Sequence, residues 1–242
     1  MTGVGTTTAQ GGLTISGAST KFLGGGRVLE HVGTGGWTGT GPIQTGSTGV
    51  GTLRLVSGIF TVGDAGAQST AASGTGTLAL EIQAGATLQK SLGGTTNFTS
   101  GVSSVTHAGA VEVVSGTLAL GATAGTYTGA VTVASGSTLD FTGGTQTLSA
   151  TSSISGTGTG TVDFSAGTVN LAGTYNLTGS TTVTGGTANF TGTLTSLGST
   201  LTVTSGTANL TTGSTNVVSL TNIHGAMMVT TGLLSRNDVP QS

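Results

Sequence analysis

Seven carboxylates and three histidines are the side chains in this sequence that could carry acid–base or metal chemistry. The acids are Glu30, Asp64, Glu81, Glu112, Asp140, Asp163 and Asp238. Cleavage of a glycosidic bond generally needs two positioned carboxylates. Asp140 and Asp163 occupy the same outward position in two repeated phrases, so we expect them on one face in neighbouring repeats. No Arg, Lys or His lies near them in the sequence, so we interpret both as surface groups that discourage sideways strand pairing.

The histidines are isolated from one another and from other potential metal ligands: His31, His107 and His224. We expect them to have surface or capping roles, because none shares a metal-ligand spacing with a second ligand. The sequence has no cysteine, which excludes a thiolate metal site and a disulfide framework. The calcium-binding Gly-Gly-x-Gly-x-Asp repeat is absent as well. We therefore expect no catalytic residue, no metal and no cofactor.

The composition is that of a folded but weakly charged chain. It contains 47 glycines and two prolines, 34% of its residues are hydrophobic, and its net charge is −2. Disordered chains usually combine low hydrophobicity with high net charge. Thr, Val, Ser and Gly dominate, which favours strands and turns over helices. The few cations are too scattered to form a basic face, so we expect no nucleic-acid partner.

Targeting signals are not evident in this sequence. The first residues, MTGVGTTTAQGG, lack the basic and apolar segments of a secretory signal. No run of about 18 apolar residues is present, so no membrane insertion is expected. If the protein is exported, its signal lies outside this sequence.

A short phrase recurs along the chain. Its best copies are VEVVSGTLAL at 111–120, VTVASGSTLDF at 131–141, VDFSAGTVNL at 162–171, TTVTGGTANF at 181–190 and LTVTSGTANL at 201–210. The common form is apolar-x-apolar, a few small residues that include Gly, and then Thr-apolar-x-apolar. Aligning the copies at Gly116, Gly167, Gly186 and Gly206 gives a period of about 20 residues, with slips.

Each phrase alternates apolar with small polar residues, which is typical of strands that bury one face. The residues that we expect to point inward are Val131, Val133, Leu139, Phe141, Val183, Phe190, Val203 and Leu210. The small residues between the strands predict a glycine-containing corner. Two short strands cannot bury their apolar faces alone, whereas stacked units can. We therefore predict an all-β fold, a parallel β-solenoid (β-helix) with about 20 residues per coil; a sandwich or Greek-key barrel is the competing architecture.

The two ends of the chain depart from the repeat. We expect residues 1–50 to be an N-terminal cap or irregular first coils, residues 51–223 to be the solenoid, and residues 224–242 to be a C-terminal cap or tail. Caps protect the open edges of stacked strands. Without them, coils would continue from one molecule to the next and build a fibre.

Two longer stretches, GTYTGAVTVASGSTLDF at 125–141 and GTYNLTGSTTVTGGTANF at 173–190, resemble the autotransporter-associated β-strand repeat of Gram-negative surface proteins and adhesins. The matching residues of the first are Gly125, Thr126, Tyr127, Thr128, Gly129, Val133, Gly136 and Leu139. Those of the second are Gly173, Thr174, Tyr175, Gly179, Thr182, Val183 and Gly186. The resemblance covers about residues 105–215. It implies a right-handed β-helical stalk displayed outside the cell, and it transfers no catalytic residue.

These patterns predict a non-enzymatic structural or adhesive protein, extracellular or at the cell surface. We expect a stalk or fibre module that assembles end to end with itself, and surface glycans as further partners. The competing class is an ice- or glycan-binding solenoid whose flat outward face presents Thr126, Thr128, Thr182, Thr184, Thr202 and Thr204. A carbohydrate-degrading enzyme built on Asp140 and Asp163 is the third class. Asparagines near one period apart predict a hydrogen-bonded ladder of Asn170, Asn189 and Asn209.

Overall fold

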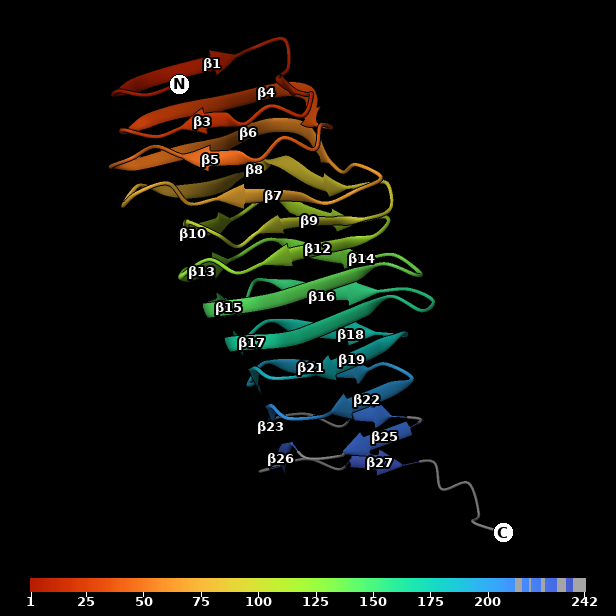
Figure 1. The fold of residues 1–242 in the computed structure, drawn as a ribbon. Coiled ribbons are helices and arrows are strands. Elements are labelled where there is room, and N and C mark those ends of the chain that lie inside the picture. The colour runs from red at the N-terminus through yellow and green to blue at the C-terminus, as the bar shows by residue number, and fades with distance from the viewer. Residues whose placement is uncertain (212–214, 218, 223–224, 230–233, 237–242) are drawn as a thin grey trace.

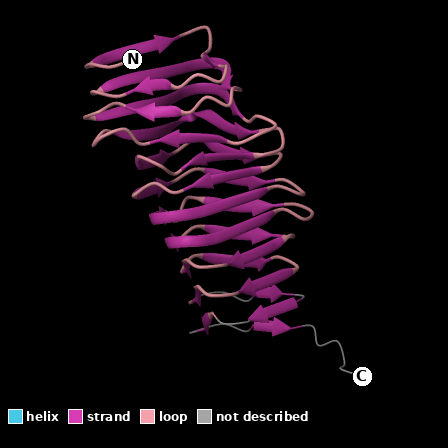
Figure 2. Ribbon diagram, viewed as in Figure 1, coloured by secondary structure: helices cyan, strands magenta, loops and turns pink. Residues whose placement is uncertain are grey.

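The computed structural model describes residues 1–211, 215–217, 219–222, 225–229 and 234–236, which stack into a parallel β-solenoid (Figure 1). The described residues form 27 strands and no helix (Figure 2), and hence no apolar helix that could cross a membrane. The chain makes about ten turns, with equivalent residues roughly 22 apart. At about 4.8 Å per turn, the stack is about 50 Å long. The predicted all-β solenoid is confirmed.

Each turn contributes strands to three columns, here named A, B and C, and the longest strands continue around a corner into a second column. Column A contains β1 (Gly5–Ala9), the first parts of β4 (Arg27–Trp37), β6 (Val50–Val62) and β8 (Thr77–Lys90), β10 (Val102–His107), β13 (Ala124–Tyr127), the last parts of β15 (Thr138–Leu148) and β17 (Thr161–Leu171), β20 (Thr187–Phe190), β23 (Thr207–Leu210) and β26 (Ala226–Val229). Column B contains β2 (Thr14–Ile15), the last parts of β4, β6 and β8, β11 (Ala110–Val113), β14 (Ala130–Val133), β16 (Ser153–Gly156), β18 (Thr174–Leu177), β21 (Thr193–Leu197), β24 (Thr215–Val217) and β27 (Leu234–Arg236). Column C contains β3 (Lys21–Leu23), β5 (Ile43–Thr45), β7 (Gln68–Ala71), β9 (Thr95–Phe98), β12 (Thr117–Leu120), the first parts of β15 and β17, β19 (Ser180–Val183), β22 (Thr200–Val203) and β25 (Ser219–Asn222).

The turns differ in length along the solenoid. Asn170 and Asn189, neighbours in column A, are 19 residues apart, whereas Arg54 and Glu81, also neighbours there, are 27 apart. Strands of the first 50 residues nevertheless pair in the same three columns as the later ones. The repeat is weak there because the corners are longer, and the strand pairing is continuous.

The interior of the solenoid is filled by the inward side chains of all three columns. All eight residues predicted to point inward are buried: Val131, Val133, Leu139, Phe141, Val183, Phe190, Val203 and Leu210. In register, equivalent residues lie directly above one another, as Leu118 lies opposite Leu139 and Leu139 opposite Val162. Each apolar side chain is therefore shielded by the coils on either side of it.

Most aromatic rings form a line through the interior, a feature that the sequence analysis did not predict. Consecutive ring centroids lie 5.0 to 6.0 Å apart along His107, Tyr127, Phe141, Phe164, Phe190 and Tyr175. Phe141 and Phe164 stack at an interplanar angle of 10°, and the other pairs meet edge to face. The rings fill the interior between the three columns.

The recurring phrase lies at two different corners of the coil. Gly116 is in the corner between β11 of column B and β12 of column C. Gly167 is in the corner of β17 where the chain passes from column C to column A. The predicted alignment of these two glycines is therefore wrong, because the phrase describes one corner with its flanking strands and each coil uses such corners more than once.

The two Gly-Thr-Tyr stretches are likewise out of phase. Tyr127 belongs to column A and Tyr175 to column B, yet both rings are buried. The Tyr127 hydroxyl donates a hydrogen bond to Gln146 Oε1 over 3.1 Å, and the Tyr175 hydroxyl lies 2.8 Å from Thr181 Oγ1. In both copies the tyrosine thus brings a hydroxyl to a buried polar side chain, which satisfies it.

Candidate functional site

The two acids singled out by the sequence lie side by side on the surface. Asp140 of β15 is directly opposite Asp163 of β17 in column C, as predicted. Ser165 Oγ donates to Asp140 Oδ1 over 2.6 Å, and Thr184 Oγ1 donates to Asp163 Oδ1 over 3.1 Å. Partial burial raises the pKa of Asp140. Residues 108–211 contain no Lys, Arg or His, so this pair has no cation from its own or neighbouring coils.

The histidines were expected to have surface or capping roles, and the surface role is wrong for His31 and His107, which are fully buried. The Leu13 amide donates to His31 Nδ1 over 3.2 Å, and Nε2 lies 3.3 Å from the Ile59 carbonyl oxygen. His224 lies outside the described residues. Nowhere in the described part of the chain do three His, Cys, Asp or Glu side chains come close enough to hold a metal ion.

His107 is a fully buried base. Neither ring nitrogen makes a hydrogen bond of standard geometry to a described residue, the backbone of Gly109 lies beside the ring and favours its charged form, and the ring packs edge to face on Tyr127. In column A it lies between Ile82 and Tyr127, so no charged group faces it from the adjacent strands. Burial lowers its pKa from 6.5 to about 4.

We expect this histidine to make the fold sensitive to acid. Below pH 6.5 the unfolded chain takes up a proton that the folded chain binds only near pH 4. Stability is therefore lost as the pH falls from 6.5 to 4, by about 3 kcal/mol in total. Denaturant unfolding at pH 7, 5.5 and 4 measures this loss, and the His107→Leu variant should lack it. Equal pH dependence in the two proteins would contradict the assignment. Asp140, whose raised pKa changes stability in the opposite direction, contributes equally to both proteins, so its effect cancels when one pH profile is subtracted from the other.

The predicted threonines do not share one face, so the expected single Thr-rich surface is not formed. Thr126 lies opposite Thr147 in column A. Thr182 lies opposite Thr202 in column C. Thr128, Thr184 and Thr204 follow these strands at their corners. The phrase that suggested the common face recurs at different corners, which is why its threonines separate.

The asparagine ladder lies in one continuous outward row of column A, which we call the outer A row. Asn189 Nδ2 donates to Asn170 Oδ1 over 2.8 Å, and Asn209 Nδ2 donates to Asn189 Oδ1 over 2.6 Å. From end to end the row is Thr8, Glu30, Arg54, Glu81, Thr106, Thr126, Thr147, Asn170, Asn189, Asn209 and Met228.

Ionic contacts replace amide contacts at the N-terminal end of the outer A row. Arg54 bridges Glu30 over 2.9 Å and Glu81 over 2.5 Å, so one guanidinium joins three turns. Hydrogen bonds from Thr8 and Arg54 lower the pKa of Glu30. Side-chain ladders of two kinds therefore link turn to turn, in addition to the backbone bonds.

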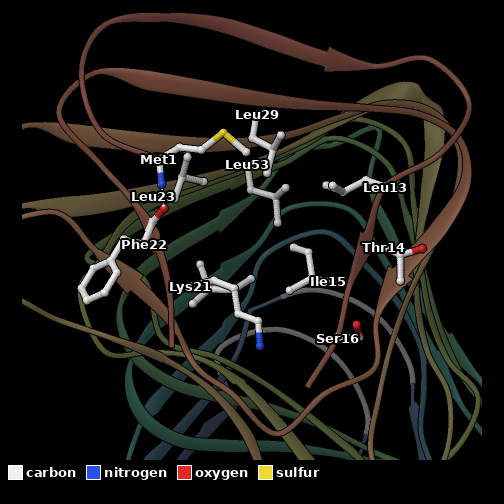
Figure 3. Close-up of a pocket in the computed structure, with 11 residues that line it drawn as sticks. Met1, Leu13, Thr14, Ile15, Ser16, Lys21, Phe22, Leu23, Leu29 and Leu53 are labelled. Carbon is white, nitrogen blue, oxygen red and sulfur yellow. Dashed lines mark hydrogen bonds between the residues drawn. The ribbon is translucent and has the colours of Figure 1, made fainter. Parts of the chain in front are cut away.

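The N-terminal end of the solenoid is open and apolar. Here β1 and β2 pair with a later strand on one side only, so columns A and B begin with an unpaired edge among the described residues. In column C, β3 pairs with β5 on one side, and on its other side Met1 alone is bonded: its amino group donates to the Phe22 carbonyl, and its carbonyl accepts from the Gly24 amide. Inside these edges lies a cavity of about 390 Å³ (Figure 3). Its apolar lining consists of Leu13, Ile15, Leu23, Leu29, Ile43 and Leu53. The hydrophobic interior thus reaches the surface at this end.

Only a few groups cover this open end. The N-terminal amino group of Met1 donates to the carbonyl oxygen of Phe22, and the Phe22 ring points away from the cavity (Figure 3). Phe22 is 49% exposed and Val4 is 82% exposed. Unpaired strand edges beside exposed apolar side chains form the kind of surface that binds another strand. The sequence analysis left open whether residues 1–50 form a cap or irregular first coils, so it identified no residues of this site.

The other end of the described solenoid also finishes with one strand per column. These last strands are β25 in column C, β26 in column A and β27 in column B. Met227 of β26 packs against the core, and Met228 is exposed. The strand directions and columns at this end therefore match those at the N-terminal end.

These features define the chain as a parallel β-solenoid repeat protein with three columns of strands. Comparison with models of protein families, with curated proteins and with solved structures found no match to it. The likeness to the autotransporter-associated repeat therefore remains a resemblance, carried by the two Gly-Thr-Tyr stretches. The β-helical repeat that it implied is what the strand pairing shows.

Proposed function

We propose that this chain is a non-enzymatic structural module, a stiff rod displayed outside the cell that assembles end to end into filaments. The open N-terminal end carries this proposal. The unpaired edges of β1 and β2, and the edge of β3 that only Met1 covers, surround an apolar cavity there. A β-solenoid coil is the structure that supplies one parallel strand to each edge together with apolar side chains for the interior. The C-terminal coil of a second copy provides one strand for each column, and Met227 of its β26 packs against the core.

The contact in this proposal is head to tail, between two different surfaces of the molecule. Such a contact does not close on itself, so it propagates as a filament. The backbone N–H and C=O groups of the edge strands gain partners, and the apolar cavity loses its contact with water. The extracellular placement and an adhesive role rest on the resemblance of residues 125–141 and 173–190 to surface-protein repeats.

The proposal is tested by sedimentation velocity and negative-stain electron microscopy of the 242-residue chain over a range of concentrations. We expect filaments that lengthen with concentration. Ile15→Glu should abolish them, because it places a carboxylate in the apolar end. Ile59→Glu is the matched control, since Ile59 is 41% exposed on the side of the rod. If the wild-type chain remains a single short rod at the highest concentration, with circular dichroism showing it folded, end-to-end assembly is wrong.

A further inference from the structure

A shallow groove of about 450 Å³ runs along the side of the rod across four consecutive turns. Each turn contributes one residue to its floor and, two residues later, one to its wall. The floor, from β11, β14, β16 and β18, consists of Glu112, Thr132, Ser155 and Asn176, which lie opposite one another in column B. The wall consists of Val114, Ala134, Thr157 and Thr178, in the corners that follow. From the floor geometry we infer that this groove binds an extended, neutral glycan.

The polar groups on the floor are largely unused. The side chains of Thr132, Ser155 and Asn176 make no hydrogen bond to another described residue. Glu112 accepts one hydrogen bond, from Gln89 Nε2 over 2.9 Å, which leaves its second oxygen free. In the outer A row, by contrast, the asparagines are bonded to one another. The groove therefore combines a concave surface with free donors and acceptors.

The direction of the groove excludes a peptide strand as its ligand. It crosses the strands and follows the rod axis, and the backbone groups of the strands already bond to the turns above and below. A bound peptide could thus gain no main-chain pairing, which is what strand addition requires. Recognition has to come from side chains that repeat about every 4.8 Å along the axis.

Charge and size favour a neutral sugar polymer. The segment 108–211 carries Glu112, Asp140 and Asp163 and no basic residue, so it repels nucleic acids and other polyanions. Hydroxyl, amide and carboxylate side chains match the hydroxyl groups of sugars. One hexose ring in an extended glycan covers a length close to the rise of one turn. The wall adds apolar contact, since Val114 is 47% exposed and can pack against the C–H face of a sugar ring.

Binding is tested by calorimetric titration of the wild-type chain with cello-, xylo-, manno- and chito-oligosaccharides of four to six sugars. We expect saturable binding of at least one series, reduced at least tenfold by Ser155→Trp, which fills the groove. Thr147→Trp, on the exposed outer A row, is the matched control and should bind as the wild type does. Thermal unfolding shows whether both variants are folded.

Three results would overturn this inference: no binding of any neutral oligosaccharide, tighter binding of heparin than of all of them, or loss of binding in Thr147→Trp with Ser155→Trp unaffected.

The site lies on the side of the rod and away from its ends, so it goes beyond the proposed assembly. Filaments without glycan binding would leave the proposed function standing, and glycan binding by single rods would leave this inference standing.

Discussion

Replacing Phe141 with alanine is expected to lower the free energy of unfolding by about 3–5 kcal/mol. Phe141 is fully buried at the centre of the aromatic line, where it stacks on Phe164 and meets Tyr127 edge to face. Its removal deletes contacts with the turns on both sides and leaves a cavity that the paired backbones cannot close. Chemical denaturation followed by circular dichroism measures the loss.

The sequence provides a matched control for this substitution. Phe22 is 49% exposed and points away from the interior (Figure 3), so in single rods, at a concentration too low for assembly, Phe22→Ala should change the free energy of unfolding by about 0.5 kcal/mol or less. Similar losses in the two variants would mean that the aromatic line does not support the stack.

Lys90→Ala is expected to cost a similar amount, about 3–5 kcal/mol, although lysine is normally a surface residue. Lys90 is fully buried in column B between Val62 and Val113. Its ammonium group donates to the carbonyl oxygens of Ser91 and Leu92, at 3.2 and 2.7 Å, and burial lowers its pKa. Truncation leaves these carbonyl groups unpaired beside a cavity in the interior.

Two further variants separate the causes of this loss. Lys90→Met keeps the apolar stem and removes the donors, so it should retain part of the stability. Lys21→Ala removes a lysine whose ammonium group bonds to Gly17 at an exposed site, and it should cost about 1 kcal/mol or less. If Lys90→Ala is as stable as Lys21→Ala in denaturant titrations, the ammonium group does not organise this corner.

Local alternation was the most informative signal in the sequence. It identified inward residues such as Val131 and Leu139 because a strand with one buried face shows its two-residue period directly. The recurring phrase did not indicate which corner of the coil it forms, because two strands joined by small residues have the same sequence pattern at every corner. The columns are distinguished only by pairing over about one turn, as between Asn170 and Asn189, which lie 19 residues apart.

Buried polar residues were beyond the reach of that signal. His107, Lys90 and Gln146 lie inside the rod, where a pattern of apolar and polar residues predicts apolar ones. Lys90 and Gln146 are accommodated by hydrogen bonds: Gln146 Nε2 donates to the carbonyl oxygens of Ala122 and Gly143, each over 2.8 Å. A side chain at position 125 would block this, since a Cβ there would lie 1.9 Å from Gln146 Oε1. The hydrogen bonds and the space that accommodate a buried polar side chain therefore come from residues about one turn away in the sequence.

The groove on column B and the open N-terminal end had no signature in the sequence either. Glu112 and Asn176 belong to different phrases, and only the register of four successive turns places them in one row. The apolar residues of the N-terminal end, such as Ile15 and Leu23, have the spacing of ordinary core residues. That they line a cavity follows from their places in β2 and β3, the first strands of columns B and C.

Directed disulfide cross-linking tests head-to-tail assembly most directly. The sequence contains no native cysteine, so each introduced cysteine is the only thiol of its chain. If register continues between molecules, β26 of one copy pairs with β1 of the next, which places Met228 opposite Thr8 in the outer A row. Paired strands lie about 4.8 Å apart, within the Cα separation of about 4.4–6.8 Å that a disulfide spans. Under mild oxidation, a mixture of differently tagged Thr8→Cys and Met228→Cys chains should form the mixed disulfide in high yield. Thr147→Cys lies in the middle of the same row, so it should not form a disulfide with Met228→Cys. If the disulfide between Thr8→Cys and Met228→Cys is no more abundant than the one between Thr147→Cys and Met228→Cys, end-to-end assembly is contradicted.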